Sequence, residues 1–174
     1  MKFEEYKASI DIDKYIAQYV NVEEFLECCK QCDGYSKKWS CPEFDFNPID
    51  YWKKFSTLEI YGRKIYLNEE ESKDWRKVLD DIKIEMAYEL FDKEKEIEGS
   101  VSLSAGSCSF CPEGQCTRPL GEPCIYPEKL RYSIEALGGN VGLTTEKLLG
   151  IKILWMTEGK MPEYFVLIGG MLIP

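Results

Sequence analysis

The chain has 174 residues and a formal net charge of −9, with 44% hydrophobic and 30% charged residues. This length and balance predict a soluble protein with a real core. The negative charge argues against nucleic acid and anionic membranes as partners, because both need a basic face. We find no apolar run near the roughly 18 residues that span a bilayer and no signal-peptide pattern at the N-terminus. We therefore expect a cytoplasmic protein.

We expect one domain over residues 1–174. Residues 1–55 are predicted to be its helical part, after an extended or frayed start at 1–10. Apolar residues recur at helical spacing from Asp11, and Asp11 or Asp13 can cap the first helix. Asn21 and Glu24 have the spacing of a second capping box.

Residues 56–174 are predicted to be an α+β part. Thr57 to Leu67 alternates apolar and polar residues and predicts a strand. Asn68 and Glu71 form a capping box that opens a long helix over about 70–97. Val101 to Ala105 predicts a short strand.

The last third of the chain is predicted to hold a helix at 128–137, a brief extended piece at 141–143, and a hairpin. Its strands are expected at 151–156 and 164–168, joined by a five- or six-residue loop. The order of elements predicts an α+β fold, with a mainly antiparallel sheet of about four strands, helices on one face, and cysteine-rich metal-binding loops. A ferredoxin-like topology is one form that such a sheet could take.

The chain contains eight cysteines and no histidine. Without histidine there is no Ser-His or Cys-His catalytic pair and no histidine-ligated zinc hydrolase. In a cytosolic chain, clustered cysteines indicate metal binding more often than disulfides.

The stretch from Gly106 to Pro127 is the stronger of two cysteine clusters. Glycine, proline and polar residues dominate it, and its spacing is C-x2-C-x4-C-x7-C. Such a loop has little apolar content to fold around, so a metal centre is expected. Zinc and an iron–sulfur cluster both accept four thiolates. The spacing, with proline beside the last cysteine, is more typical of iron–sulfur proteins. The predicted ligands are Cys108, Cys111, Cys116 and Cys124.

The second cluster lies in the helical part, where Cys29, Cys32 and Cys41 are predicted ligands. Cys28 points about 100° away from Cys29 on a helix, so it is not expected to hold the same ion and could be a core residue. Three ligands leave either a fourth ligand elsewhere in the fold or an open coordination site.

Tyr35 and Trp39 lie between these cysteines and could shield a cluster from water, or pack as ordinary core residues.

The motif Cys29-x2-Cys32-x2-Tyr35-x3-Trp39-Ser-Cys41-Pro is followed much later by Gly-x-Cys108-x2-Cys111-x4-Cys116-x5-Glu-Pro-Cys124-x2-Pro-x3-Arg131-x-Ser-x-Glu-Ala. This pattern resembles an uncharacterised family of cysteine-rich, predicted metal-binding proteins from anaerobic bacteria and archaea. The resemblance covers nearly the whole chain. It implies a role for Arg131, Ser133 and Glu135 beside the cofactor loop, with a capped, solvated helix face as the alternative. The chain departs from the family pattern at Glu43, where a second proline is usual, and at Ile125, where a basic residue is common.

Three functions remain open at this stage. The first is a cytosolic iron–sulfur protein of the [4Fe–4S] type, with one or two clusters, which transfers electrons or serves a redox enzyme as an accessory protein. The second is a zinc-stabilised module that binds other proteins. The third is an enzyme with an open-site cluster at the Cys29–Cys41 segment. The first two predict a redox or protein partner.

Overall fold

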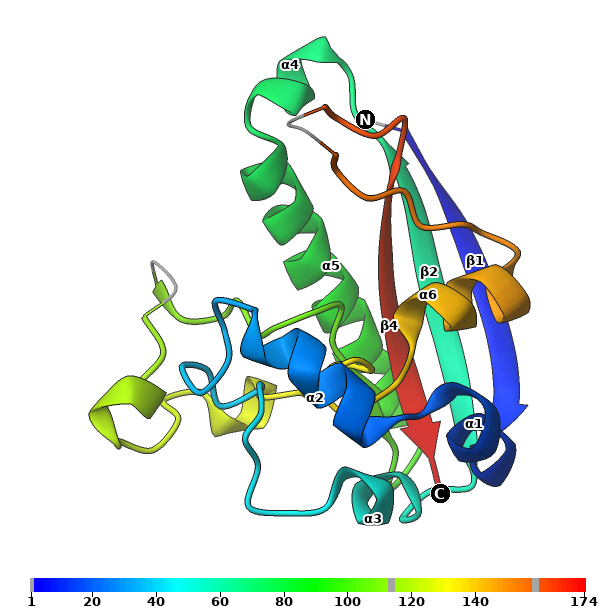
Figure 1. Cartoon of the computed structure of the whole chain (residues 1–174), viewed down its shortest axis with the longest axis vertical. Helices are drawn as coiled ribbons and strands as arrows, with labels where there is room; N and C mark the ends of the chain where they lie inside the picture. Colours follow the sequence, from blue (N-terminus) through cyan, green and yellow to red (C-terminus); the bar gives the residue numbers. More distant parts are fainter. Residues whose placement is uncertain (1, 113–114, 158–159) are drawn as a thin grey trace.

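The computed structural model describes residues 2–112, 115–157 and 160–174. Its centre is a four-stranded antiparallel sheet with the order β1-β2-β4-β3 (Figure 1). The strands are β1 (Lys2–Asp11), β2 (Thr57–Tyr66), β3 (Val101–Leu103) and β4 (Phe165–Ile173). Strand β4 lies between β2 and β3, so the unit β2-helix-β3 is split by a third strand. The sheet shares this split unit with ferredoxin-like folds.

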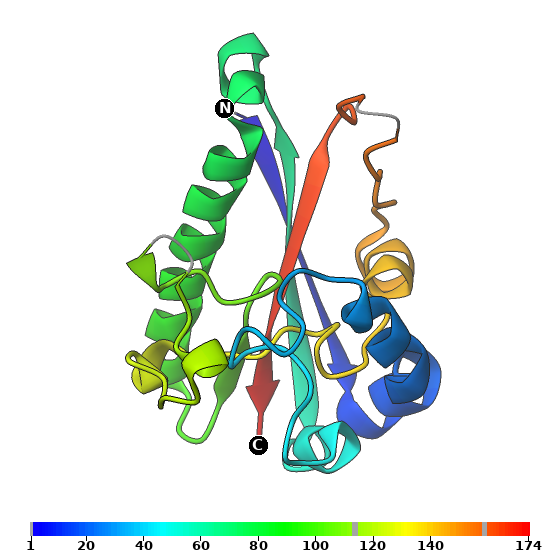
Figure 2. The same cartoon turned by 60° about the vertical axis from the view of Figure 1, so that its left-hand side comes forward.

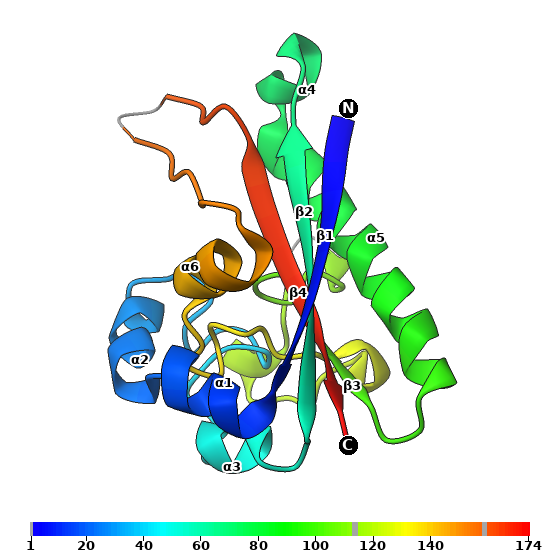
Figure 3. The same cartoon turned by 90° about the vertical axis from the view of Figure 1, so that its right-hand side faces the viewer.

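Helices cover both faces of the sheet, whereas we expected them on one face. The long helix α5 (Trp75–Glu96) lies on one face, and α1 (Ile12–Tyr19) and α6 (Val141–Thr144) lie on the other (Figures 2 and 3). The remaining helices are short: α2 (Val22–Lys30), α3 (Pro48–Trp52) and α4 (Glu69–Lys73). In the described ranges, no helix is both long and apolar enough to cross a bilayer.

Each face of the sheet carries its own hydrophobic cluster. On the α5 face, Ile65 of β2 packs with Ile82 and Met86 of the helix. On the opposite face, buried side chains that include Ile60 and Trp52 form the larger core. Alternate residues of a strand point to opposite faces, so one central strand supplies both clusters.

Local signals in the sequence are confirmed at three helix starts. The side chains of Asp11, Asn21 and Asn68 each accept a hydrogen bond from a backbone N–H in the first turn of the helix that follows. Asn68 and Glu71 form the full reciprocal capping box. The long helix that we expected after it is divided at Asp74 into α4 and α5.

The N-terminal segment is not frayed. Residues 2–11 pair with 57–66 of β2 along their whole length and form an edge strand. Polar residues on both faces of this segment hide the strand pattern, because an edge strand needs little apolar surface.

Three predictions in the last third of the chain are wrong. Residues 128–137 form no helix beyond a 3₁₀ turn at Pro127–Lys129, and 141–143 belong to α6 instead of an extended piece. Residues 151–156 are not a strand, although Ile151 is buried in the larger core. The expected hairpin does not form, and β4 pairs instead with β2 along its whole length and with β3 near its end. Two residues of its expected loop, Glu158 and Gly159, lie outside the described residues.

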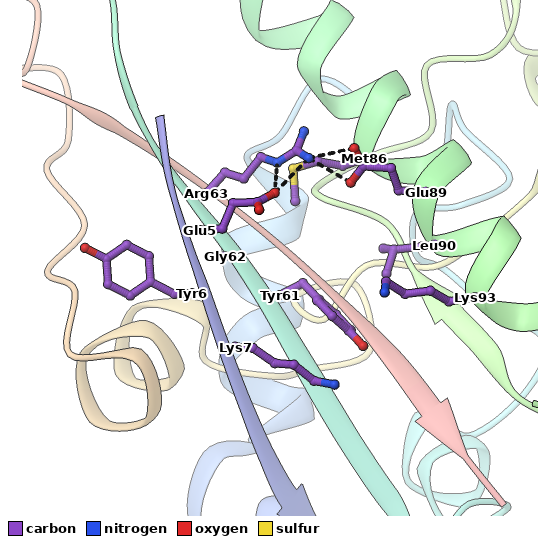
Figure 4. Close-up of a pocket in the computed structure, with 10 residues that line it drawn as sticks. All are labelled: Glu5, Tyr6, Lys7, Tyr61, Gly62, Arg63, Met86, Glu89, Leu90 and Lys93. Carbon is purple, nitrogen blue, oxygen red and sulfur yellow. Dashed lines mark hydrogen bonds and ion pairs between the residues drawn. The ribbon is translucent and has the colours of Figure 1, made fainter. Parts of the chain in front are cut away.

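Arg63 of β2 joins the sheet to α5 through three carboxylates, and Figure 4 shows its contacts with two of them, Glu5 and Glu89. Its side chain is 5% exposed, and it pairs with Glu5 of β1 at 3.0 Å. It also pairs with Glu85 at 3.0 Å and Glu89 at 2.7 Å, both on α5. One guanidinium thus connects β1, β2 and the helix, and it borders a cavity between them.

We expect Arg63→Met to lower the free energy of unfolding by about 1–3 kcal/mol, because three carboxylates lose their shared cation. The expected loss stays below that of a fully buried network because each glutamate is about half exposed. Urea unfolding measures the change, with the exposed Arg76→Met as the matched control. Equal unfolding midpoints for the two variants would contradict the role of Arg63.

Candidate metal centre

The four cysteines of the 106–127 loop line one small cavity. Their neighbours in its wall include Lys38, Trp39 and Ser40, which come from the other cysteine segment. All four thiols are partly buried. The loop therefore gathers four sulfur donors around one space, although they are spread over seventeen positions of the chain. The gathered donors are Cys108, Cys111, Cys116 and Cys124.

Side chains of the loop pack against helix α5 and attach the loop to it. The ring of Phe110 packs against the rings of Tyr88 and Phe91, with centroids 5.7 and 5.8 Å apart. Lys83 of the same helix donates a hydrogen bond to Ser109 at 3.2 Å. These contacts fix the start of the loop on a rigid element.

The other cysteine segment begins at the end of α2 and continues through a series of turns. Cys29 is partly buried and Cys32 is exposed, and a turn hydrogen bond of 2.9 Å joins the Cys32 N–H to the Cys29 carbonyl. Cys41 is buried. Cys28 is exposed, so the suggestion that it is a core residue is wrong. Its thiol lies on the solvent side of a short surface helix.

The two cysteine segments pack directly against each other. The Cys108 N–H donates to the Ser40 hydroxyl at 3.0 Å, across 68 positions of sequence. The Lys38 ammonium donates to the Cys108 carbonyl at 2.9 Å and to the Ser107 hydroxyl at 3.2 Å. The two cysteine segments, which are far apart in the sequence, therefore lie against each other in the structure.

Arg118, which belongs to the loop, also contacts the other cysteine segment. Its guanidinium donates to the carbonyls of Lys38, Cys41, Pro42 and Glu43. The Lys38 carbonyl is 2.8 Å from Nη1. One side chain therefore holds the backbone that surrounds Cys41.

The three side chains predicted to bind a cofactor lie in three different surroundings. Trp39 borders the cavity, and its indole N–H donates to the Glu122 carbonyl at 3.1 Å. Tyr35 donates to Glu43 at 2.7 Å. Arg131 pairs with Glu94 of α5 at 2.6 Å and stacks on Phe91. Among these three side chains, only Trp39 borders the cavity beside the four cysteines.

Burial raises the pKa of several thiols. The pKa of Cys29 rises to about 11, through burial first and then through the neighbouring Glu135, Cys41 and Cys32. Burial is also the main cause of the raised pKa values of Cys41, Cys108 and Cys111, and Lys38 opposes it in each case. Metal binding requires thiolates, so a bound cation has to offset this burial.

The donor set fits a metal that prefers sulfur. Four thiols, with no histidine in the chain, match the Cys₄ coordination of zinc and of iron–sulfur clusters. Within the described ranges, however, no group of three or more cysteine, aspartate or glutamate side chains is already arranged as a metal site. Metal binding would therefore have to draw the donors together.

Sequence reasoning missed Lys38 as a member of this region but had named Glu135. Lys38 bonds to the loop, and a lysine in a polar segment gives no signal of such a long-range contact. The Glu135 carboxylate acts on the Cys29 and Cys41 thiols. The family resemblance had implied a role for Glu135 beside the cluster loop through the Arg-x-Ser-x-Glu-Ala motif.

A family model described as "Predicted metal-binding protein (DUF2284)" matches residues 15–173. It covers both cysteine segments and the residues that join them. Comparison with curated proteins and with solved structures gives no match.

Proposed function

Because the chain belongs to the family of predicted metal-binding proteins (DUF2284), we propose that it is an iron–sulfur protein that passes electrons to or from a protein partner. The cluster is of the [4Fe–4S] type and is held by the loop cysteines. The observation that carries the proposal is the single cavity that all four of these thiols line.

The residues around the cavity suit a cluster held by thiolates. Lys38 supplies a positive charge beside the sulfurs, and the Trp39 ring limits the access of water. The bound cluster would supply one-electron redox chemistry. The chain contributes the ligands, the nearby charge and the shielding, and this function needs no histidine or other catalytic side chain. A redox partner and a cytoplasmic location complete the proposal.

Metal analysis of anaerobically purified protein tests the proposal. We expect about four iron atoms and four sulfide ions for a filled loop site, with broad visible absorbance that bleaches on reduction. Stoichiometric zinc with no iron would overturn the iron–sulfur assignment. It would favour the alternative, a zinc-stabilised module that binds other proteins and unfolds when a chelator removes the metal.

A further inference from the structure

We propose that Glu135 is the fourth donor of a second metal site, formed with Cys29, Cys32 and Cys41. The site would take a divalent cation that prefers thiolates, such as zinc. This inference builds on the proposed function, because it assigns a separate centre to the second cysteine segment. It names the ligand that the sequence left open.

The Glu135 carboxylate carries an unmet bonding requirement. Its Oε2 atom is buried and has no hydrogen-bond partner in the described part of the protein. An ionised carboxylate needs a donor or a cation there, and a protonated one needs an acceptor. Leaving a buried polar atom unsatisfied costs about 1–3 kcal/mol. The missing partner is therefore expected to be a species that binds from solution.

Glu135 lies beside the second cysteine segment. Its carboxylate lies close enough to Cys29 and Cys41 for their charges to interact. Gly106 lies against the Glu135 carboxylate, and its chain neighbour Ser107 lies, with Cys41, against Gly34. A Cβ at Gly106 would be 3.8 Å from Glu135 Oε1, and a Cβ at Gly34 would be 3.0 Å from Cys41 Sγ and 3.9 Å from Ser107 Cβ.

The nearby cations do not satisfy this carboxylate. Lys83 donates to Asp80 and Ser109, and Lys38 donates to Ser107 and Cys108. Both ammonium groups still lie near the site, where they would offset the negative charge left when three thiolates and a carboxylate hold a divalent cation. A metal ion can satisfy the buried oxygen and the three sulfurs at once.

The spacing of the donors also suits the site. Cys29 and Cys32 are joined by a turn at the end of α2, which is the form of a C-x2-C knuckle. Cys41 and Glu135 reach the same region from separate segments. A site with four protein ligands has no open coordination position, so the number of cysteines no longer argues for an open-site enzyme.

Cobalt titration of the metal-free full chain under anaerobic conditions tests the proposal, because thiolate-bound Co²⁺ absorbs strongly. The variants are Glu135→Gln, Cys41→Ser and, as the matched control, the exposed Glu128→Gln. Glu135→Gln is expected to weaken one of two Co²⁺ sites at least about tenfold, as expected for loss of a direct ligand, and to leave the other unchanged. Cys41→Ser should affect the same site, and Glu128→Gln neither.

The thermal midpoint of the metal-free variants separates a ligand from a structural residue. As a ligand, Glu135 should be replaceable by glutamine with no loss of metal-free stability, because a buried carboxylate is removed. A lower metal-free midpoint with unchanged Co²⁺ affinity would overturn the proposal in favour of a structural role or a bound water molecule. Cys116→Ser serves as an independent check. If it changes neither Co²⁺ site, the loop assignment fails, while the Glu135 result still stands.

Discussion

Serine at Cys116 or Cys124 is expected to abolish the metal centre of the loop, whereas Cys28→Ser is expected to leave it intact. Both loop thiols border the shared cavity, and a hydroxyl is a poor substitute for a thiolate ligand of a soft metal. Cys28 is exposed on α2. Each variant replaces one sulfur atom with oxygen. The variants differ only in where the altered residue lies in the fold.

The loss should appear in metal content and in stability. A metal present at about 100 times its dissociation constant stabilises the native state by about 2.7 kcal/mol. We expect the loop variants to lose this stabilisation. Elemental analysis and thermal unfolding, with and without a chelator, measure the two effects. Full metal content in Cys116→Ser and Cys124→Ser, equal to that of Cys28→Ser, would contradict the loop assignment.

Arg118→Gln is expected to lower the free energy of unfolding by about 2–3 kcal/mol, because four backbone carbonyls lose a charged donor. The same change should loosen the contact between the two cysteine segments, so metal affinity should fall at both. Denaturant unfolding and metal titration measure these effects.

Arg76→Gln provides the control, because this exposed arginine contacts the neighbouring Trp75 ring. If Arg118→Gln had the small effect of that control, the carbonyl contacts would not hold the interface. A loss of stability with unchanged metal affinity would limit Arg118 to a structural role.

Local signals predicted well wherever a structure depends on adjacent residues. Asn68 and Glu71 specify a helix start because their partners lie within one turn. The strand expected at 57–67 is confirmed as β2, because its alternation is strong and both of its faces are covered.

Predictions failed where distant partners overrode a local pattern. The stretch 128–137 has helical spacing, yet Ser104 and Ser133 form a parallel bridge, and Arg131 is held by Glu94 of α5. Tyr132 packs among Phe44 and other aromatic rings. A regular helix would give up these contacts, and they outweigh its modest intrinsic propensity.

The sequence by itself determined which side chains are available to hold a metal. Eight cysteines without histidine restrict any metal centre to thiolate and carboxylate ligands, and the C-x2-C-x4-C-x7-C spacing lets a single loop supply four of them. The spacing makes a shared site in one loop possible, because a short loop brings its own ligands together at little entropic cost.

Only the tertiary structure decided which groups meet. Ser40 contacts Cys108 across 68 positions, and the charge of Glu135, from a segment that looked helical, lies near Cys29. The same structure shows that Arg131 is held by α5 and that Cys28 faces solvent. Such contacts depend on how two sheet faces bury their side chains, and burial is a property of the whole chain.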